Sequence, residues 1–143
     1  MGKIELDNIV ITNLRIIETD GGDVMHGLKQ SEVNFCGFGE AYFSKINYNA
    51  IKGWKKHLEM TMNLIVPFGN VRFVFYSETL NYFRIETIGE DNYNRITVPP
   101  GIWFAFQGLD KKKNIILNIS NLMHNPEEVR RKNIGDIQFN WKI

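Results

Sequence analysis

The chain has 143 residues, 43% of them hydrophobic, which is enough for one domain with a sizeable core. Seventeen Lys and Arg residues nearly balance sixteen Asp and Glu residues, and a net charge of +1 gives no overall attraction for nucleic acid or an anionic membrane. Cys36 is the only cysteine, which excludes an internal disulfide and a multi-cysteine zinc site and is typical of a reducing compartment. No apolar run reaches membrane-spanning length. We therefore expect a single domain over residues 1–143 of a soluble, cytoplasmic protein.

Short segments rich in β-branched and aromatic residues recur along the chain and predict an all-β protein. Stretches rich in Gly, Asp, Asn and Lys separate most of them and are typical of turns. In chain order, the predicted strands cover residues 9–12, 14–19, 40–46, 61–66, 70–77, 82–88, 95–98, 102–106 and 114–119.

Residues 70–77 carry apolar side chains on both faces of the predicted strand. One set of alternate positions is wholly apolar, and the other combines Arg72, Val74 and Tyr76. A sandwich or small barrel that forms a homodimer would bury both faces.

The one helical candidate of note is residues 125–132, near the C-terminus. Asn125 is a suitable N-cap, Pro126 suits the first turn, and Glu127 and Glu128 oppose the helix dipole. We expect one short, peripheral helix here.

Residues 51–57, with the sequence IKGWKKH, combine a glycine, an aromatic residue and several basic residues. If the segment is a strand, Lys55 and His57 project from the same face and bring two basic groups together. The alternative is an exposed edge strand whose charges are merely solvated.

The surrounding residues match the spacing of the two cupin motifs. The first motif, with a glycine, two histidines, a glutamate and a second glycine, corresponds to Gly53, Lys55, His57, Met62 and Gly69. The second corresponds to Pro99, Gly101 and Phe104. Strands and a turn separate the motifs, as in a jelly-roll barrel.

Only His57 remains of the four usual cupin metal ligands. Lys55 and Phe104 replace histidines and Met62 replaces the glutamate, and these groups do not form the nitrogen and carboxylate shell that Mn, Fe or Zn requires. We predict a cupin without a metal or other cofactor.

Residues 39–46, 51–66 and 98–134, together with FNW at 139–141, resemble the small sugar-epimerase-like cupins related to dTDP-4-dehydrorhamnose 3,5-epimerase. The resemblance extends from about residue 20 to residue 141. It implies a metal-free jelly-roll barrel, usually a homodimer, that works among the enzymes making nucleotide-linked deoxysugars for surface polysaccharides. The alternative is an unrelated β-sandwich with chance motifs.

In the full epimerases, the resemblance implies, the histidine of an Arg-Gly-Leu-His stretch removes the proton beside the C4 ketone of the sugar. Here Lys52 stands at the arginine and Lys55 at the histidine. A lysine with its usual pKa of about 10.4 is protonated at neutral pH, so it would need burial or a nearby cation to act as a base. Lys56 and His57 are candidate neighbours.

Other positions of the family pattern are also changed. The family's second basic residue corresponds to Met62, and its acid-donating tyrosine falls near Leu122 and Met123, beside His124. In the N-terminal segment His26 stands in for a ligand-binding glutamate, and no arginine is present.

Each further candidate has a structural alternative. His26 is a ligand contact or a surface histidine, and His124 is catalytic or a capping residue. Arg72 binds a diphosphate if it points into the barrel and is solvated if it points out. Trp103 stacks on a base or belongs to the core.

Three asparagines alternate with apolar residues on predicted strands and are candidates for binding sugar hydroxyls. Buried amides need hydrogen-bond partners even without a ligand. These residues are Asn63, Asn118 and Asn121.

The sequence thus predicts an isomerase or epimerase that acts through an enolate on a nucleotide-linked 4-keto-6-deoxysugar, with a dTDP-linked sugar as one candidate. His57 is the first choice for the base, and Lys55 would stabilise the enolate oxygen or the phosphates. The alternatives are a nucleotide-sugar 3,4-ketoisomerase and a non-catalytic cupin that binds a sugar nucleotide.

Overall fold

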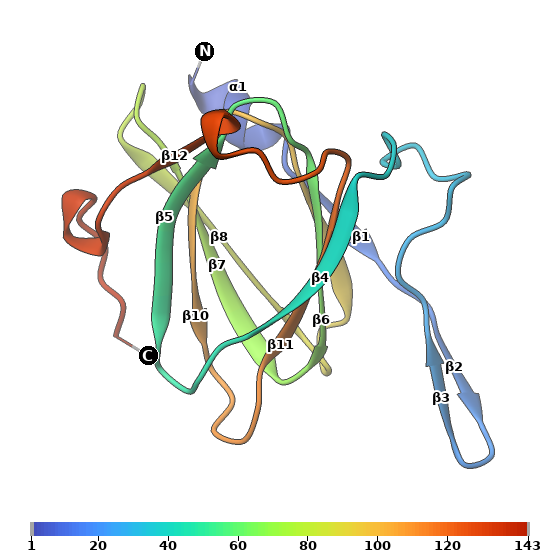
Figure 1. The fold of residues 1–143 in the computed structure, drawn as a ribbon. Helices are drawn as coiled ribbons and strands as arrows, with labels where there is room; N and C mark the ends of the chain where they lie inside the picture. Colours follow the sequence, from blue (N-terminus) through green and yellow to red (C-terminus); the bar gives the residue numbers. More distant parts are fainter. Residues whose placement is uncertain (1, 143) are drawn as a thin grey trace.

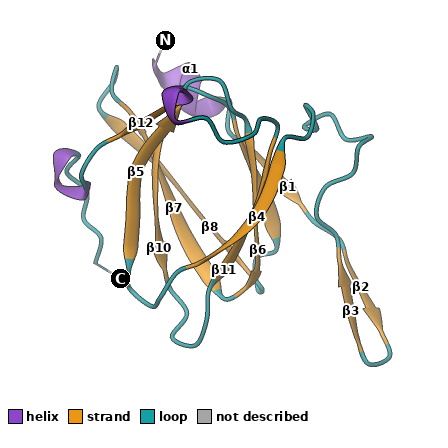
Figure 2. Ribbon diagram, in the orientation of Figure 1, coloured by secondary structure: helices purple, strands orange, loops and turns teal. Residues whose placement is uncertain are grey.

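The computed structural model describes residues 2–142, so residues 1 and 143, the outermost positions of the expected domain, lie outside the described part. Within this range two five-stranded antiparallel sheets face each other as a barrel, and a two-stranded hairpin projects from it (Figures 1 and 2). The predicted all-β jelly roll is confirmed.

The first sheet has the strand order β1 (Val10–Asn13), β9 (Asn94–Val98), β6 (Met62–Phe68), β11 (Ile115–Ser120) and β4 (Glu40–Lys45). The second has the order β12 (Val129–Arg131), β5 (Ile51–His57), β10 (Trp103–Gly108), β7 (Asn70–Ser77) and β8 (Tyr82–Gly89). The hairpin consists of β2 (Ile16–Thr19) and β3 (Gly22–Met25).

The main core lies between the two sheets, because alternate residues of each strand point inward. Leu64 and Val66 of β6 belong to the same buried cluster as Phe73 and Phe75 of β7. The segment α1 (Gly2–Asp7) packs against β7 and β8 and adds the fully buried Leu6 to this cluster. No described helix is both long and apolar enough to cross a membrane.

The C-terminal residues 134–141 cover the outer face of the second sheet. Ile137 packs with the buried Val74 and Trp54, and Phe139 and Trp141 contact the same cluster. This chain therefore covers the second apolar face of residues 70–77 itself, which removes our sequence-based reason for expecting a homodimer.

The expected C-terminal helix is shorter than its eight-residue segment. Asn125 Oδ1 accepts the N–H of Glu127 at 3.1 Å, as a cap should, but the helix is a single 3-10 turn, η1 (Pro126–Glu128). Val129–Arg131 then pairs with the edge of β5 as β12, because a free edge offers ladder hydrogen bonds. A second 3-10 turn, η2 (Ile134–Asp136), and α1 were not predicted.

Candidate active site

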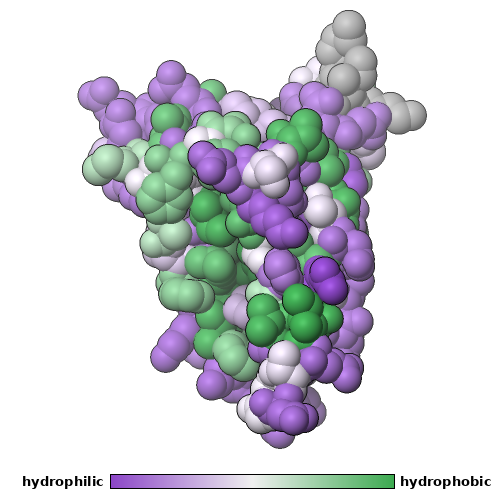
Figure 3. All heavy atoms as spheres, turned by 90° about the vertical axis from the view of Figure 1, so that its right-hand side faces the viewer, coloured by the Kyte–Doolittle hydropathy of each residue, from purple (hydrophilic) through white to green (hydrophobic). Residues whose placement is uncertain are grey.

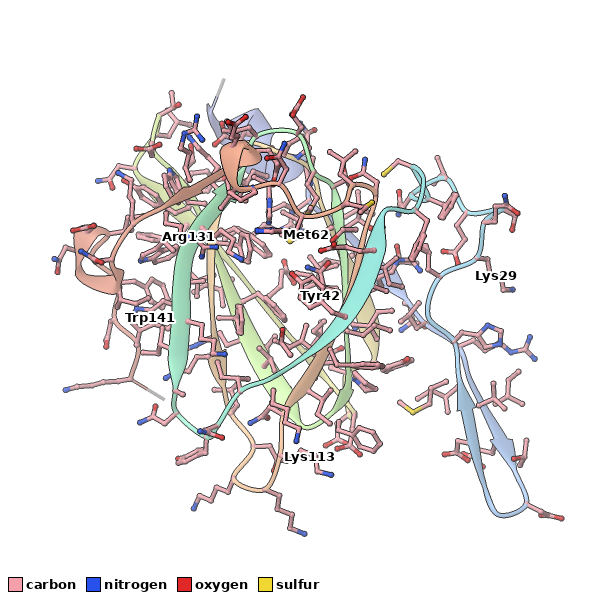
Figure 4. The ribbon with its side chains drawn as sticks, viewed as in Figure 1. Lys29, Tyr42, Met62, Lys113, Arg131 and Trp141 are labelled. Carbon is pink, nitrogen blue, oxygen red and sulfur yellow. The ribbon has the colours of Figure 1, made fainter. Side chains whose placement is uncertain are left out.

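A cavity of about 530 Å³ lies between the sheets and opens to solvent. Strands of both sheets line it with polar residues and an apolar floor of Met62, Leu64, Phe73 and Phe104. In Figure 4, Tyr42 and Met62 lie inside the barrel and Arg131 lies beside β5. The polar lining includes Tyr42, Ser44, Lys52, Lys55, His57, Asn118 and Arg131.

A buried histidine–carboxylate pair forms part of the site, and its His57 lines the cavity. His57 is 5% exposed and Glu128 is 3% exposed, and His57 Nδ1 is hydrogen-bonded to Glu128 Oε1. The other carboxylate oxygen accepts the N–H groups of Glu59 and Met60, each at 3.1 Å. His57 Nε2 is buried and has no hydrogen-bond partner among the described residues. One ring nitrogen is thus oriented by Glu128 and the other is free.

The protonation of this pair follows from its surroundings. Burial lowers the pKa of His57 and outweighs the opposing effect of Glu128. Burial raises the pKa of Glu128, but hydrogen bonds from His57 and from two backbone N–H groups outweigh it, so the pKa of Glu128 is lowered. The favoured state is a neutral imidazole that donates Nδ1–H to a carboxylate, with the lone pair of Nε2 free. That is the state of a general base.

An irregularity in β5 places two lysines in the cavity. Lys55 pairs with Phe104, but Gly53 pairs with the next residue, Ala105, so Trp54 is an extra residue in the strand. Strict alternation would put Lys52 and Lys55 on opposite faces, whereas both line the cavity. A Cβ at position 53 would lie 2.3 Å from the Cβ of Ala105, so this position requires glycine.

The cavity is positively charged from its mouth inward. Lys52 and Arg131 are exposed and Lys55 is half-buried. Burial lowers the pKa of Lys55, the charges of Arg131 and Lys52 lower it further, and Glu128 acts in the opposite direction. The expected neighbour Lys56 instead forms an ion pair with Glu78 at 3.6 Å.

Tyr42 and Asn118 belong to the first sheet, opposite β5. Asn118 Nδ2 donates a hydrogen bond to the hydroxyl oxygen of Tyr42 at 3.0 Å. Both residues line the cavity, so the Tyr42 hydroxyl hydrogen is available to a ligand. Asn118 was a sequence candidate, whereas Tyr42 was missed.

Glu128 was also missed as a site residue. The sequence pattern assigned it to a helix N-terminus, and no local signal shows that β12 brings it to His57, 71 residues away. Tyr42 had a weak signal, because Tyr42 and Ser44 share one face of β4. The alternation does not say which face is inside.

Three predicted ligand contacts lie on the outer faces of the sheets. Arg72 donates to Gln107 and, at 2.9 Å, to the backbone oxygen of Trp141. Trp103 Nε1 donates to Glu78 at 2.6 Å. Asn63 Oδ1 accepts from Arg95 Nε at 3.1 Å.

The other three candidates lie in loops outside the cavity. Asn121 Oδ1 accepts the N–H of Thr61 at 2.8 Å. His26 follows the projecting hairpin, and its backbone oxygen accepts the Tyr93 hydroxyl at 2.8 Å. His124 is exposed, and its N–H donates to Glu40. The structure therefore brings Lys52, Lys55, His57 and Asn118 together and separates the other six.

The four positions that bind metal in other cupins converge on this cavity. Lys55, His57, Met62 and Phe104 all line it, but an amine, a thioether and a phenyl ring beside one imidazole do not fit a transition metal. Among residues 2–142 no cluster of three or more His, Cys, Asp or Glu residues could hold one. That the protein works without metal stays a prediction, which elemental analysis of the purified protein would test.

Comparisons with known proteins agree with the fold. No family model matches the chain. The crystal structure of a dTDP sugar isomerase from Desulfovibrio desulfuricans G20 is 31% identical, with a TM-score of 0.88 over 94% of this chain and 91% of that chain. The protein therefore belongs to the sugar-epimerase-like cupins, the family of dTDP-4-dehydrorhamnose 3,5-epimerase.

Two further relatives are more distant. The spore coat polysaccharide biosynthesis protein SpsL of Bacillus subtilis (strain 168) is 24% identical over 145 residues, which cover 95% of this chain and 96% of SpsL. The dTDP-4-dehydrorhamnose 3,5-epimerase of Elizabethkingia anophelis NUHP1 is 17% identical over 95% of this chain and 82% of its own, with a TM-score of 0.78. A match at 17% identity supports the fold alone.

Proposed function

We propose that this protein is an isomerase that moves a proton beside the ketone of a nucleotide-linked 4-keto-6-deoxysugar, in the synthesis of a surface polysaccharide. The observation that carries the proposal is the buried His57–Glu128 pair. His57 lines a positively charged cavity, and its Nε2 has no hydrogen-bond partner among the described residues. The dTDP sugar isomerase at 31% identity supports a dTDP-linked substrate, and SpsL supports a polysaccharide pathway.

The chemistry begins at the carbon next to the ketone. The carbonyl acidifies this C–H bond, and neutral His57 takes the proton on Nε2 while Glu128 stabilises the resulting imidazolium. The nearby cation of Lys55 or Arg131 favours the negative charge that develops on the substrate.

The arrangement of charge suggests how a substrate lies. Lys52 and Arg131, which are exposed, suit a diphosphate, and the buried His57 suits the sugar. We therefore propose that the sugar enters first and that the nucleotide remains near the opening.

Tyr42 takes the role of proton donor, which in the family pattern belongs to a tyrosine near Leu122 and Met123, beside His124. It projects from β4 in the first sheet, whereas His57 projects from β5 in the second. A base on one wall and an acid on the other favour removal and return of the proton on opposite faces of the sugar, which is epimerisation. The 3,4-ketoisomerase alternative returns the proton to a different atom.

Incubation with dTDP-4-keto-6-deoxyglucose in heavy water, followed by NMR and mass spectrometry, tests the proposal. We expect deuterium to enter next to the ketone. The exchange rate should fall by about a hundredfold or more in His57→Ala. It should stay near the wild-type rate in His124→Ala, which makes the same change at an exposed histidine. We expect Tyr42→Phe to slow epimer formation more than exchange. Binding of the nucleotide sugar without any exchange would contradict the isomerase and leave the non-catalytic cupin.

The homodimer remains a proposal and now rests on the first sheet. Its outer face carries an apolar cluster that includes Ile65, Leu117 and Ile119, and Phe43 on β4 is 69% exposed. Figure 3 shows apolar side chains on this side of the molecule, and the hairpin of β2 and β3 projects beside it. A two-stranded hairpin is marginal alone, so we propose that a second copy covers it and this face.

A further inference from the structure

We propose that Lys55 is a covalent catalyst that condenses with the substrate ketone to form an iminium, from which His57 removes the neighbouring proton. This inference rests on the proposed ketone substrate. It assigns Lys55 a different role from the electrostatic one that its charge alone suggests.

The contacts of Lys55 differ from those of lysines that hold a fixed charge. Lys56 and Lys132 both pair with Glu78, at 3.6 and 3.5 Å. Within the described residues no ion pair or hydrogen bond engages the Lys55 amine, although the side chain is half-buried in the cavity. The buried carboxylate of Glu128 is already occupied by His57 and two backbone N–H groups.

The surroundings of Lys55 favour a nucleophilic amine. Burial and the charges of Arg131 and Lys52 lower its pKa, which increases the share of the neutral amine. Only the neutral amine has the lone pair that attacks a carbonyl carbon, and desolvation beside another cation is a known way to activate a lysine.

His57 is placed to act on the next atom of the same substrate. Lys55 and His57 are two residues apart on β5 and both line the cavity. An imine carbon and the carbon that loses its proton are directly bonded, so their catalytic groups must approach from one region. Two residues of one strand on one wall satisfy this requirement.

The proposed steps balance without an oxidant or reductant. The Lys55 nitrogen adds to the carbonyl carbon and passes one of its protons to the oxygen. The resulting hydroxyl group takes a second proton from solvent and leaves as water, and a C=N iminium remains. His57 Nε2 then removes the adjacent proton. The C–H electron pair becomes a C=C bond, and the C=N π pair returns to nitrogen to give an enamine. Protonation at carbon and addition of water regenerate the ketone and the free amine.

Reductive trapping tests the covalent step directly. The protein is incubated with dTDP-4-keto-6-deoxyglucose, treated with borohydride, and analysed by intact mass and peptide mapping. We expect one adduct on Lys55 in the wild type and in Lys56→Arg, a matched change on the same strand. We expect no adduct in Lys55→Arg, which keeps the charge but has no primary amine.

Two measurements separate this inference from the proposed function. In H₂¹⁸O, the ketone oxygen of the substrate should exchange faster with the wild-type protein present than without it. This measurement needs no variant. His57→Ala should keep the adduct but lose deuterium exchange by about a hundredfold. An adduct with no deuterium exchange would support the imine and contradict the isomerase.

One pattern of results would overturn the imine and leave the isomerase intact. In that pattern, deuterium enters the substrate, no adduct forms, and ¹⁸O exchange stays at the uncatalysed rate. Lys55→Arg would then retain deuterium exchange within about threefold, as expected of a purely electrostatic role.

Discussion

At the scale of single residues, the site depends on how Glu128 orients His57. The carboxylate only accepts hydrogen bonds, so it holds the proton of His57 on Nδ1 and keeps Nε2 free as a base. The two adjacent backbone N–H groups hold the carboxylate in turn. The base is therefore defined by three elements: β5, η1 and the loop after β5.

Glu128→Gln should lower deuterium exchange by about a hundredfold or more, with little change in nucleotide-sugar binding. A Gln side chain of similar size can present its N–H₂ to Nδ1, which moves the imidazole proton to Nε2 and removes the base. Exchange kinetics and calorimetry on the same samples measure the two effects. Glu127→Gln, an exposed neighbour in η1, is the matched control. Wild-type exchange in Glu128→Gln would contradict the role of the pair.

The same pair makes stability depend on pH. The pKa of His57 is lower in the folded state than its unfolded value of about 6.5, so the unfolded chain binds more protons below that pH. The neutral His57 therefore makes its full contribution to the free energy of unfolding above pH 6.5, and this contribution is lost as the pH falls toward the pKa of His57 in the folded state. Glu128, whose folded pKa is also lowered, acts in the same direction at more acidic pH.

Urea denaturation from pH 8 to pH 5 should therefore show wild type losing more stability than His57→Gln, which lacks the titrating ring. A wild type that instead gained stability relative to the variant on acidification would mean that Glu128 raises the pKa of His57 and that the pair is charged.

At the scale of elements, β5 decides which side chains enter the cavity. The extra residue at Trp54 puts Lys52 and Lys55 on the same side and sends the indole outward, where Nε1 donates to the Ile134 oxygen at 3.2 Å. The strand thus contributes to the active site on one face and anchors the C-terminal segment on the other.

Gly53→Ala should destabilise the protein by about 1–3 kcal/mol, because the new Cβ would overlap Ala105 and push β5 from β10. Substrate binding should weaken as well, since Lys52 and Lys55 lie one and two residues from Gly53 and both line the cavity. Urea denaturation and calorimetry measure the two effects. In Gly135→Ala the new Cβ has no neighbour within 4 Å, so that variant should remain close to wild type. Equal stability of the two variants would contradict the close approach of β5 to β10 at Gly53 and Ala105.

At the scale of the whole molecule, the two sheets have different outer surfaces. The second sheet is covered by residues 134–141 of its own chain. The first sheet bears Phe43 and the projecting hairpin, so it is the face available for another subunit (Figure 3).

Light scattering at micromolar concentration should give the mass of a dimer, and Phe43→Asp should shift it toward the monomer, because a carboxylate placed in an apolar interface is costly. Leu80→Asp, at an exposed position in the turn after β7, should leave the mass unchanged. A monomer mass for the wild type would rule out this assembly.

The sequence by itself determined the all-β architecture and much of the cavity. Alternating apolar strands and turn residues specify the sheets, and the spacing of Lys55 and His57 located one wall of the site, because residues two apart on a regular stretch of strand share a face.

Only the tertiary structure decided which faces point inward and which distant residues meet. Arg72 and Asn63 alternate with apolar residues as Asn118 does, yet they point outward. Both sheets carry apolar residues on their outer sides too, so alternation alone does not say which face is inside. Glu128 reaches His57 through the pairing of β12 with β5, and Lys52 joins Lys55 through the extra residue in β5. Long-range strand pairing and a one-residue change of register leave no periodic signal in the local sequence, so the general base became apparent only in the folded protein.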